Sequence, residues 1–270
     1  MDIIVQMMSY SFIVRAFIVG ILVSLCAALL GVSLVLKQYS MIGDGLSHVS
    51  YGALSIAVAC GIAPLKLSIP VVIAAAFVLL RMNENGMMKS DAAIAAMSAS
   101  ALAIGVTVTS FTTGMTTDVC SYMFGSILAM SQEDVVLSVI LSAVVLILFI
   151  FCYNSIFAVT FDENFARATG VKVSFYNTVI SVLTAVTIVL GMQMMGAMLI
   201  SSLVIFPALS SMRLFKSFKS VMVSSGILAV VCFCIGITIS YIYSVPAGAS
   251  IVIVNLCVFI VFFLIQKLKL

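Results

Sequence analysis

The sequence predicts an all-α polytopic membrane protein with eight or nine transmembrane helices. Of its 270 residues, 64% are hydrophobic and only 8% are charged, whereas a soluble domain is roughly half apolar and about a quarter charged. Long apolar runs recur along the whole chain, and the loops between them are short and carry charges or turn residues. No soluble domain of ordinary size fits between these runs, so we expect one transmembrane domain over residues 1–270.

Nine hydrophobic runs define the expected helices. The first is too long for the core of a signal peptide and is expected to remain as a helix. The second has only about 16 residues, or about 24 Å of helix, and falls short of a hydrocarbon core of roughly 30 Å. The stretch before it, MIGDGLSHVS (41–50), is therefore expected to dip into the membrane as a loop that turns at Gly43 and Gly45. The break around Gly191 and Gly196 predicts a tight external hairpin. The runs cover 11–36, 46–61, 64–81, 91–110, 132–155, 173–192, 195–212, 220–241 and 248–266.

Lysines and arginines predict the orientation in a plasma or inner membrane. With the C-terminus in the cytoplasm, ten of the twelve cations lie on the inside, as the positive-inside rule requires. The N-terminus is then outside, and only Arg15 and Lys66 lie away from the cytoplasm. The inside cations are Lys37, Arg81, Lys89, Arg167, Lys172, Arg213, Lys216, Lys219, Lys267 and Lys269.

The only histidine of the chain, His48, stands four residues after Asp44. On a helix this spacing brings the two Cβ atoms to about 5–6 Å, so both side chains can converge on one ion. A carboxylate and a neutral imidazole suit Zn²⁺ and Mn²⁺. In the simpler alternative, Asp44 caps the helix and His48 satisfies a carbonyl. The expected position of Asp44 and His48 within the membrane favours a role in metal transport, because ionisable groups are costly there. A second copy of the chain in a homodimer, or water, would supply the missing ligands.

Other candidate metal ligands are better explained by packing. The thioethers of MQMMGAM (192–198), which are Met192, Met194, Met195 and Met198, are soft enough for Cu(I), but methionine is also a common filler of apolar cores. The seven cysteines are scattered and form no C-x-x-C pair. We expect neither a catalytic site nor a permanently bound cofactor.

The segment PALSSMRLFKSFKS (207–220) combines cations with apolar residues at helical spacing. Pro207 is expected to open a short amphipathic helix that carries Arg213, Phe215 and Lys216. Docking to a partner and anchoring at the inner leaflet both remain open from these residues alone. The chain has no G-x-x-x-x-G-K-[ST] motif, so we expect an ion gradient or a separate ATPase to drive any uphill transport.

Five segments resemble the motifs of the zinc and manganese ABC importer permeases, the ABC-3 family. In chain order they are YSMIGDGLSHVSYGAL (39–54), DVCSYMFGSILAMSQEDV (118–135), FARATGVKV (165–173), MMGAMLISSLVIFPALSSMRL (194–214) and VPAGASIVI (245–253). The resemblance implies a homodimeric permease of the type II ABC importer fold. Its partners would be a cytoplasmic ABC ATPase and an extracytoplasmic metal-binding protein, with no nucleic acid involved.

The same resemblance implies roles for individual residues. The family motif G-D-x-L-x-H falls on Gly43, Asp44, Leu46 and His48, and makes Asp44 and His48 the metal-contacting pair. Pro207 and the basic stretch after it, with Arg213, Phe215 and Lys216, fall on the part expected to couple to the ATPase. The run HVS (48–50) is closer to zinc-type members, so Zn²⁺ is expected before Mn²⁺ as the transported ion.

The expected mechanism is alternating access. The metal-binding protein would dock on the loop at 111–131 and release the ion into a path that passes Asp44 and His48. The rival interpretation is a self-contained metal channel or secondary carrier, which would need no ATPase.

Overall fold

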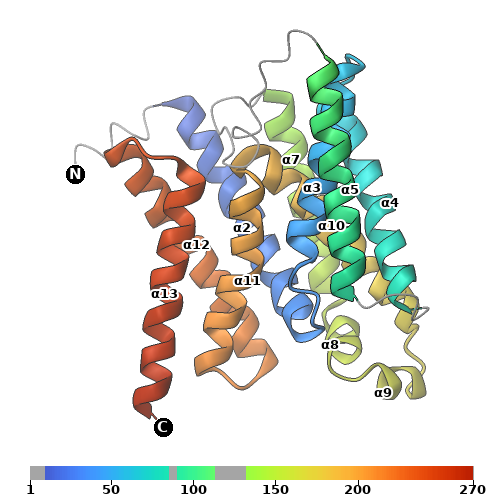
Figure 1. Ribbon diagram of the computed structural model, residues 1–270. Helices are drawn as coiled ribbons and strands as arrows, with labels where there is room; N and C mark the ends of the chain where they lie inside the picture. Colours follow the sequence, from blue (N-terminus) through green and yellow to red (C-terminus); the bar gives the residue numbers. More distant parts are fainter. Residues whose placement is uncertain (1–9, 85–89, 113–131, 270) are drawn as a thin grey trace.

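The computed structural model describes residues 10–84, 90–112 and 132–269 (Figure 1). Within these ranges every regular element is an α-helix. The loop expected to receive a metal-binding protein, 111–131, lies almost wholly outside the described residues.

Nine of the described helices have 18 or more residues, and each coincides with one of the nine predicted runs. Eight of the nine are long and apolar enough to cross a membrane, and the exception is the more polar α3. Two short helices, α8 and α9, follow α7. The bounds are α2 Ser11–Leu36, α3 Ile42–Ala59, α4 Pro64–Glu84, α5 Ser90–Phe111, α7 Gln132–Phe151, α8 Tyr153–Phe161, α9 Glu163–Ala168, α10 Val173–Met195, α11 Ala197–Leu214, α12 Phe218–Tyr243 and α13 Ala247–Lys269.

The prediction of a loop at 41–50 is wrong, because α3 begins at Ile42 and includes almost all of this stretch. Gly43 and Gly45 therefore lie in the first turn of a helix and not in a bend. Gly45 faces the side chain of Ile94 on α5, and Gly43 faces Ser201 on α11. The helix forms where the sequence indicated a loop because two neighbouring helices pack against its first turn.

The run predicted at 132–155 also ends early. The chain turns at Cys152, and α8 leaves the direction of α7. Its aromatic residues explain the turn, because the rings of Tyr153, Phe157 and Phe161 all lie against Phe218 at the start of α12. Aromatic packing at the end of the bundle therefore outweighs continuation of the helix.

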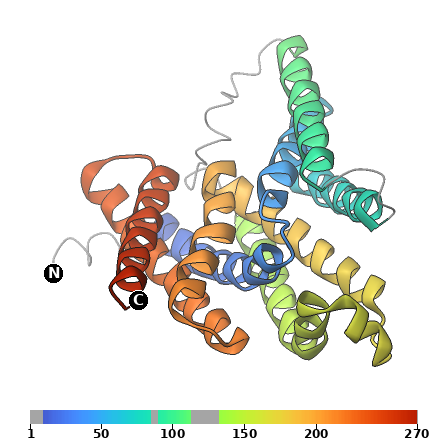
Figure 2. The ribbon, with the colours of Figure 1, turned by 60° about the horizontal axis from the view of Figure 1, so that its bottom comes forward.

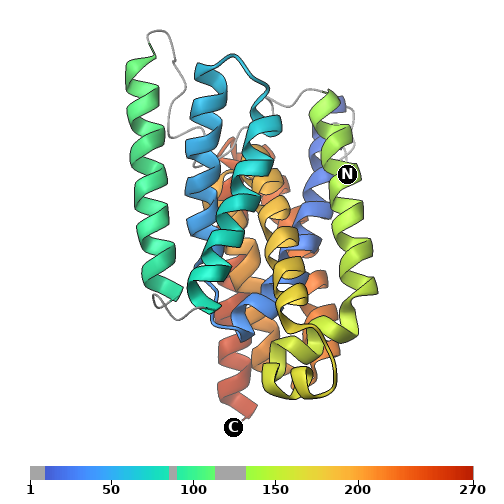
Figure 3. The same ribbon diagram turned by 90° about the vertical axis from the view of Figure 1, so that its right-hand side faces the viewer.

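The long helices form a bundle in which α2, α10 and α11 are central and α5, α7 and α13 are peripheral (Figures 1 and 2). Helices α3, α4 and α5 stand together at one side, and α3 and α4 join them to α10 (Figure 3). The peripheral helices expose large apolar side chains, among them Ile104, Ile140, Ile147, Ile253 and Ile260. Such a surface suits contact with lipid rather than water.

Small residues let the helices that frame the candidate site approach closely. A Cβ atom on Gly52 of α3 would lie 2.8 Å from the carbonyl oxygen of Ala101 on α5, and one on Gly105 would lie 2.6 Å from the ring of Tyr51. Glycine pairs of this kind are typical of close helix contacts in membranes. They press α3 against α5 and fix the direction of the helix that carries Asp44 and His48.

The described cations separate between the two ends of the bundle. Helices α2 and α4 begin near the upper end of Figure 1, and Arg15 and Lys66 belong to the first residues of these two helices. The lower end holds the C-terminus, α8 and α9. The remaining described cations belong to α9, to the ends of α2, α4, α11 and α13, or to the starts of α10 and α12, and they are Lys37, Arg81, Arg167, Lys172, Arg213, Lys216, Lys219, Lys267 and Lys269.

Candidate functional site

Asp44 and His48 lie one turn apart at the start of α3, and their side chains converge. The Nε2 atom of His48 is 3.7 Å from Oδ2 of Asp44, and the two side chains are 20% and 48% exposed. Two ligands bound to zinc at about 2.0–2.2 Å with a tetrahedral angle stand about 3.4 Å apart. A small side-chain rotation would therefore let one ion contact both atoms. Within the described residues no third His, Cys, Asp or Glu joins them.

Asp44 does not cap α3, which weighs against the simpler alternative. The N-cap residue is Met41, and no side chain accepts a hydrogen bond there. The Asp44 carboxylate lies in the first turn, where the positive end of the helix dipole favours a negative charge. The nearby hydroxyl of Ser47 donates to the Asp44 backbone carbonyl at 2.7 Å, and within the described residues the carboxylate itself has only the 3.7 Å contact with His48. The carboxylate is thus available to a ligand.

A stripe of hydroxyl groups continues from this pair along α3, and the sequence reasoning missed it. Tyr51 and Ser55 follow Asp44 and His48 at helical spacing on the same face. The Tyr51 hydroxyl lies 3.4 Å from Oγ1 of Thr109 on α5, which in turn donates to Ser55 Oγ at 3.4 Å. The recurrence of polar residues at positions i, i+4, i+7 and i+11 was the signal that could have found it.

The four methionines of 192–198 do not converge on one point. Met192 packs with Tyr51 and Ala197, whereas Met194 and Met195 belong to the main apolar core. Met198 is 46% exposed. The three buried positions agree with the packing role expected for the methionines, and Met198 does not.

The predicted amphipathic helix opening at Pro207 is wrong. Pro207 lies buried inside α11, which continues to Leu214, and the chain then passes through an extended residue, Phe215, before α12 begins at Phe218. Proline normally breaks a soluble helix, but membrane helices tolerate it where neighbours satisfy the freed backbone groups. The helix continues past Pro207 because apolar residues lie on both sides of it.

The structure separates the other three residues of the predicted coupling segment. Arg213 turns back to α13, where Nη1 donates to Gln266 Oε1 at 3.3 Å and the guanidinium lies 5.3 Å from the centre of the Phe263 ring. Phe215 and Lys216 are exposed in the link between α11 and α12. Of the four residues predicted to couple to an ATPase, only these two are exposed.

A second exposed feature of the same end is the short helix α9, which the sequence reasoning missed. Asp162 caps it by accepting hydrogen bonds at 2.9 Å from the backbone N–H groups of Asn164 and Phe165. Ala166 is buried beneath it, while Phe165 is 64% exposed. The signals were an Asp at the N-cap and Gly170 just after the helix end, which together predict a short helix.

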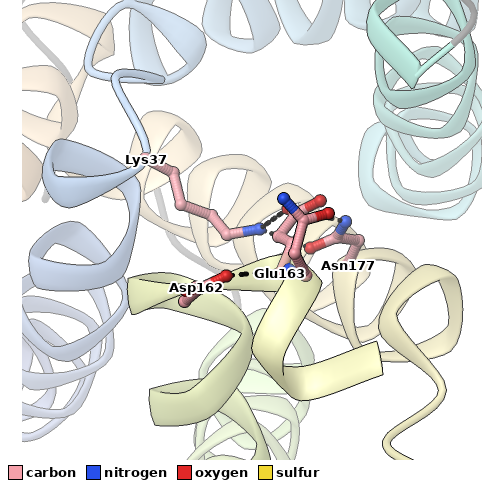
Figure 4. Close-up of polar contacts among 5 residues, drawn as sticks. Lys37, Asp162, Glu163 and Asn177 are labelled. Carbon is pink, nitrogen blue, oxygen red and sulfur yellow. Dashed lines mark hydrogen bonds and ion pairs between the residues drawn. The ribbon is translucent and has the colours of Figure 1, made fainter. Parts of the chain in front are cut away.

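Three residues distant in sequence tie α9 to the bundle (Figure 4). Lys37 Nζ, at the end of α2, lies 2.7 Å from Glu163 Oε1 and donates to Asn177 Oδ1 of α10 at 2.5 Å. Asn177 Nδ2 donates to the same Glu163 oxygen at 3.2 Å. Burial alone would raise the pKa of Glu163, but the hydrogen bond and charge of Lys37, aided by Asn177 and Arg167, outweigh it and hold the pKa below its usual value.

Comparison with known proteins places this arrangement among transport proteins. The sequence profile of the ABC 3 transport family matches residues 9–266. The manganese import system permease protein ScaB of Streptococcus gordonii is 29% identical over 95% of this chain and 92% of its own length. The high-affinity zinc uptake system membrane protein ZnuB of Haemophilus influenzae is 26% identical over 91% of this chain and 94% of its own.

A solved structure extends the likeness to the fold. The structure described as PsaBC from Streptococcus pneumoniae in complex with Fab contains a chain that superposes with a TM-score of 0.86 at 29% identity. The match covers 97% of this chain and 94% of that one. The profile match, the nine long helices and this superposition agree from one end of the chain to the other. The chain belongs to the ABC 3 transport family.

Proposed function

We propose that this chain is the membrane permease of an ATP-driven importer of a divalent transition metal, with Zn²⁺ preferred over Mn²⁺. The observation that carries the proposal is the convergence of Asp44 and His48 at 3.7 Å in a membrane protein of whose residues only 8% are charged. An imidazole suits Zn²⁺, and a carboxylate accepts either ion. The family membership supports transport, and relatives named for manganese and for zinc support this class of cargo.

The incomplete ligand set fits a site that must release its ion. Two protein ligands hold a transition metal loosely, and the partly exposed Asp44 carboxylate can meet water or a second copy of the chain. A closed site with four protein ligands would bind the ion too tightly for passage. We therefore propose a transit site in a homodimer rather than a storage site.

The distribution of cations supports an orientation. Under the positive-inside rule, the end that carries Lys37, Lys172 and Lys216 faces the cytoplasm. The start of α2 then lies at the outer face and the end of α13 at the inner face.

An ATPase partner would bind the cytoplasmic end. The sequence has no phosphate-binding loop of its own. This end offers the exposed Phe165 of α9 and the exposed Phe215 and Lys216 of the α11–α12 link. The two elements are joined, because Phe218, just after the link, packs on the rings of α8, just before α9. ATP-driven closure of the partner would move both and open the path alternately to each side of the membrane.

Uptake by the reconstituted complex tests the proposal. The chain, its candidate ATPase and its binding protein would be placed in liposomes, and uptake of radioactive Zn²⁺ would be measured with and without ATP and in competition with Mn²⁺. ATP-dependent uptake that excess Zn²⁺ suppresses more strongly than Mn²⁺ is the expected result. Metal uptake by the permease alone, without the ATPase, would contradict the proposal and support a channel or secondary carrier.

A further inference from the structure

We propose that Lys37 is a positioning residue that links α9 mechanically to the Asp44–His48 pair. Movement of α9 on the cytoplasmic side would thereby change the surroundings of the metal path. This inference rests on the proposed function and adds to it the residue through which the energy of ATP reaches the ion.

The first step of the argument is the strength of the junction. Lys37 contacts Glu163 and Asn177, and these two contact each other, so the three side chains close a triangle between α2, α9 and α10. The Lys37 side chain is only 8% exposed. An ammonium buried to this degree needs its charged and polar partners, and separation from them leaves the charge without water or a counter-ion. Lys37 therefore moves together with Glu163 at the start of α9.

The second step is the stiffness of the connection from Lys37 to the candidate site. The backbone N–H of Tyr39 donates to Leu34 at 2.8 Å and that of Gln38 to Val35 at 3.1 Å, which closes the end of α2 in a Schellman motif. Gln38 takes the left-handed position with φ of 62°. Next, the Ile42 N–H donates to Tyr39 at 3.0 Å and starts α3. Hydrogen-bonded turns thus connect Lys37 almost to Asp44. A displacement of Lys37 is therefore passed on to the start of α3.

The third step is the space for movement. A cavity lies beside the α2–α3 link and is bordered by Lys37, Tyr39, Ile42 and Asn177, with apolar side chains of α4 and α5 opposite. The cavity has a volume of about 30 Å³, which allows a small displacement of the link before its side chains meet those of α4 and α5. The start of α3 is thus tied to α9 through the α2–α3 link, and the cavity borders that link on the side of α4 and α5.

The test is the number of metal ions transported per ATP hydrolysed by the reconstituted complex. This ratio does not depend on how much complex is correctly folded, so a purely structural defect leaves it unchanged. We expect Lys37→Met to lower the ratio by roughly fivefold or more, the lower end of usual coupling between sites. Lys66→Met, which alters an exposed lysine at the opposite end, is the matched control and should keep the wild-type ratio.

Exchange of the two charges gives a second readout. Lys37→Glu and Glu163→Lys are each expected to lower the ratio, and the double variant is expected to recover most of it because the ion pair is restored with reversed polarity. If Lys37→Met does not reach the membrane, Asn177→Ala replaces it. That change leaves the ion pair and removes two hydrogen bonds, and a lowered ratio is again expected.

The outcomes separate this inference from the proposed function. A wild-type complex that transports no metal overturns the proposed function and the inference with it. A wild-type complex that transports metal, together with an unchanged ratio in the Lys37 or Asn177 variants, overturns the inference alone. Failure of the double variant to exceed both single variants also counts against it.

Discussion

At Gly31 the backbones of α2 and α11 approach each other closely, and replacement of this glycine by alanine gives a sharp test of the packing. A Cβ atom at this position would lie 2.1 Å from the carbonyl oxygen of Val204 and 2.9 Å from its carbonyl carbon. Non-bonded carbon and oxygen atoms need at least about 3.2 Å, so the two helices would have to separate by about 1 Å. Both helices lie in the centre of the bundle, where their neighbours resist such a shift.

The size of the effect follows from two opposed contributions. Alanine gains about 1 kcal/mol over glycine in helix propensity. Overpacking of a dense core costs about 1–3 kcal/mol, and more where nothing can rotate away. The atom met here is a backbone carbonyl, so the cost lies at or above the upper end of that range. We expect Gly31→Ala to destabilise the protein by about 2 kcal/mol, which corresponds to a lower midpoint of thermal unfolding by about 4–8 °C.

Gly43→Ala is the matched control. Gly43 is also a buried helical glycine, but its Cβ would meet nothing closer than 3.7 Å. Thermal unfolding in detergent can be followed with a thiol-reactive dye, which reports exposure of the buried Cys26 and Cys232 as a rise above the signal of the exposed Cys60 and Cys257. Gly43→Ala should match or exceed the wild-type midpoint. An unfolding midpoint for Gly31→Ala equal to that of Gly43→Ala would refute the close contact between α2 and α11.

At three further residues, the direction in which a substitution changes the stability of the protein can be predicted. Phe218→Ala removes a buried ring that lies against three rings of α8. It should destabilise the protein by about 3–5 kcal/mol, and the same dye assay would contradict this with an unchanged midpoint. Gly196 joins α10 to α11 with φ of 87° and ψ of 161°, a region that other residues avoid. Gly196→Ala should therefore cost about 1–3 kcal/mol, and wild-type stability would argue against that backbone. Glu163 has a pKa held below its usual 4.5, so its ion pair contributes stability above about pH 4.5 that is lost as the pH falls through the folded-state value. The difference in unfolding midpoint between wild type and Glu163→Gln should be constant from pH 8 to pH 5 and disappear at lower pH, and a difference that changes near neutrality would contradict the shift.

The positions of the long helices could be predicted from the sequence, because the thickness of the hydrocarbon core sets the length of all the apolar runs except the short second one. The same reasoning was wrong where contacts between helices decide whether a segment is helical. Two glycines and an aspartate before the second run indicated a loop, but α5 and α11 pack against Gly45 and Gly43 and make the segment helical. Pro207 indicated a helix start, but it lies within a continuous apolar helix.

The candidate site was predictable in part for a similar reason. The spacing of Asp44 and His48 places both side chains on one helix face, and the structure brings them together. Their role as metal ligands remains a prediction. The triangle around Lys37 was not predictable, since its members are separated by up to 140 positions in sequence and nothing local in the chain indicates that they meet. Contacts of this kind become visible only once the bundle has formed.

The central claim is that Asp44 and His48 lie on the path of the transported metal. The most direct test compares ATP-driven uptake of radioactive Zn²⁺ by the reconstituted complex carrying wild-type chain, Asp44→Asn or His48→Gln, at matched amounts in the membrane. Asp91→Asn is the control, because Asp91 is an exposed carboxylate in the first turn of the adjacent α5. We expect both site variants to lose uptake and the control to keep it. Wild-type uptake by both site variants would show that the ion takes another path and would contradict this account.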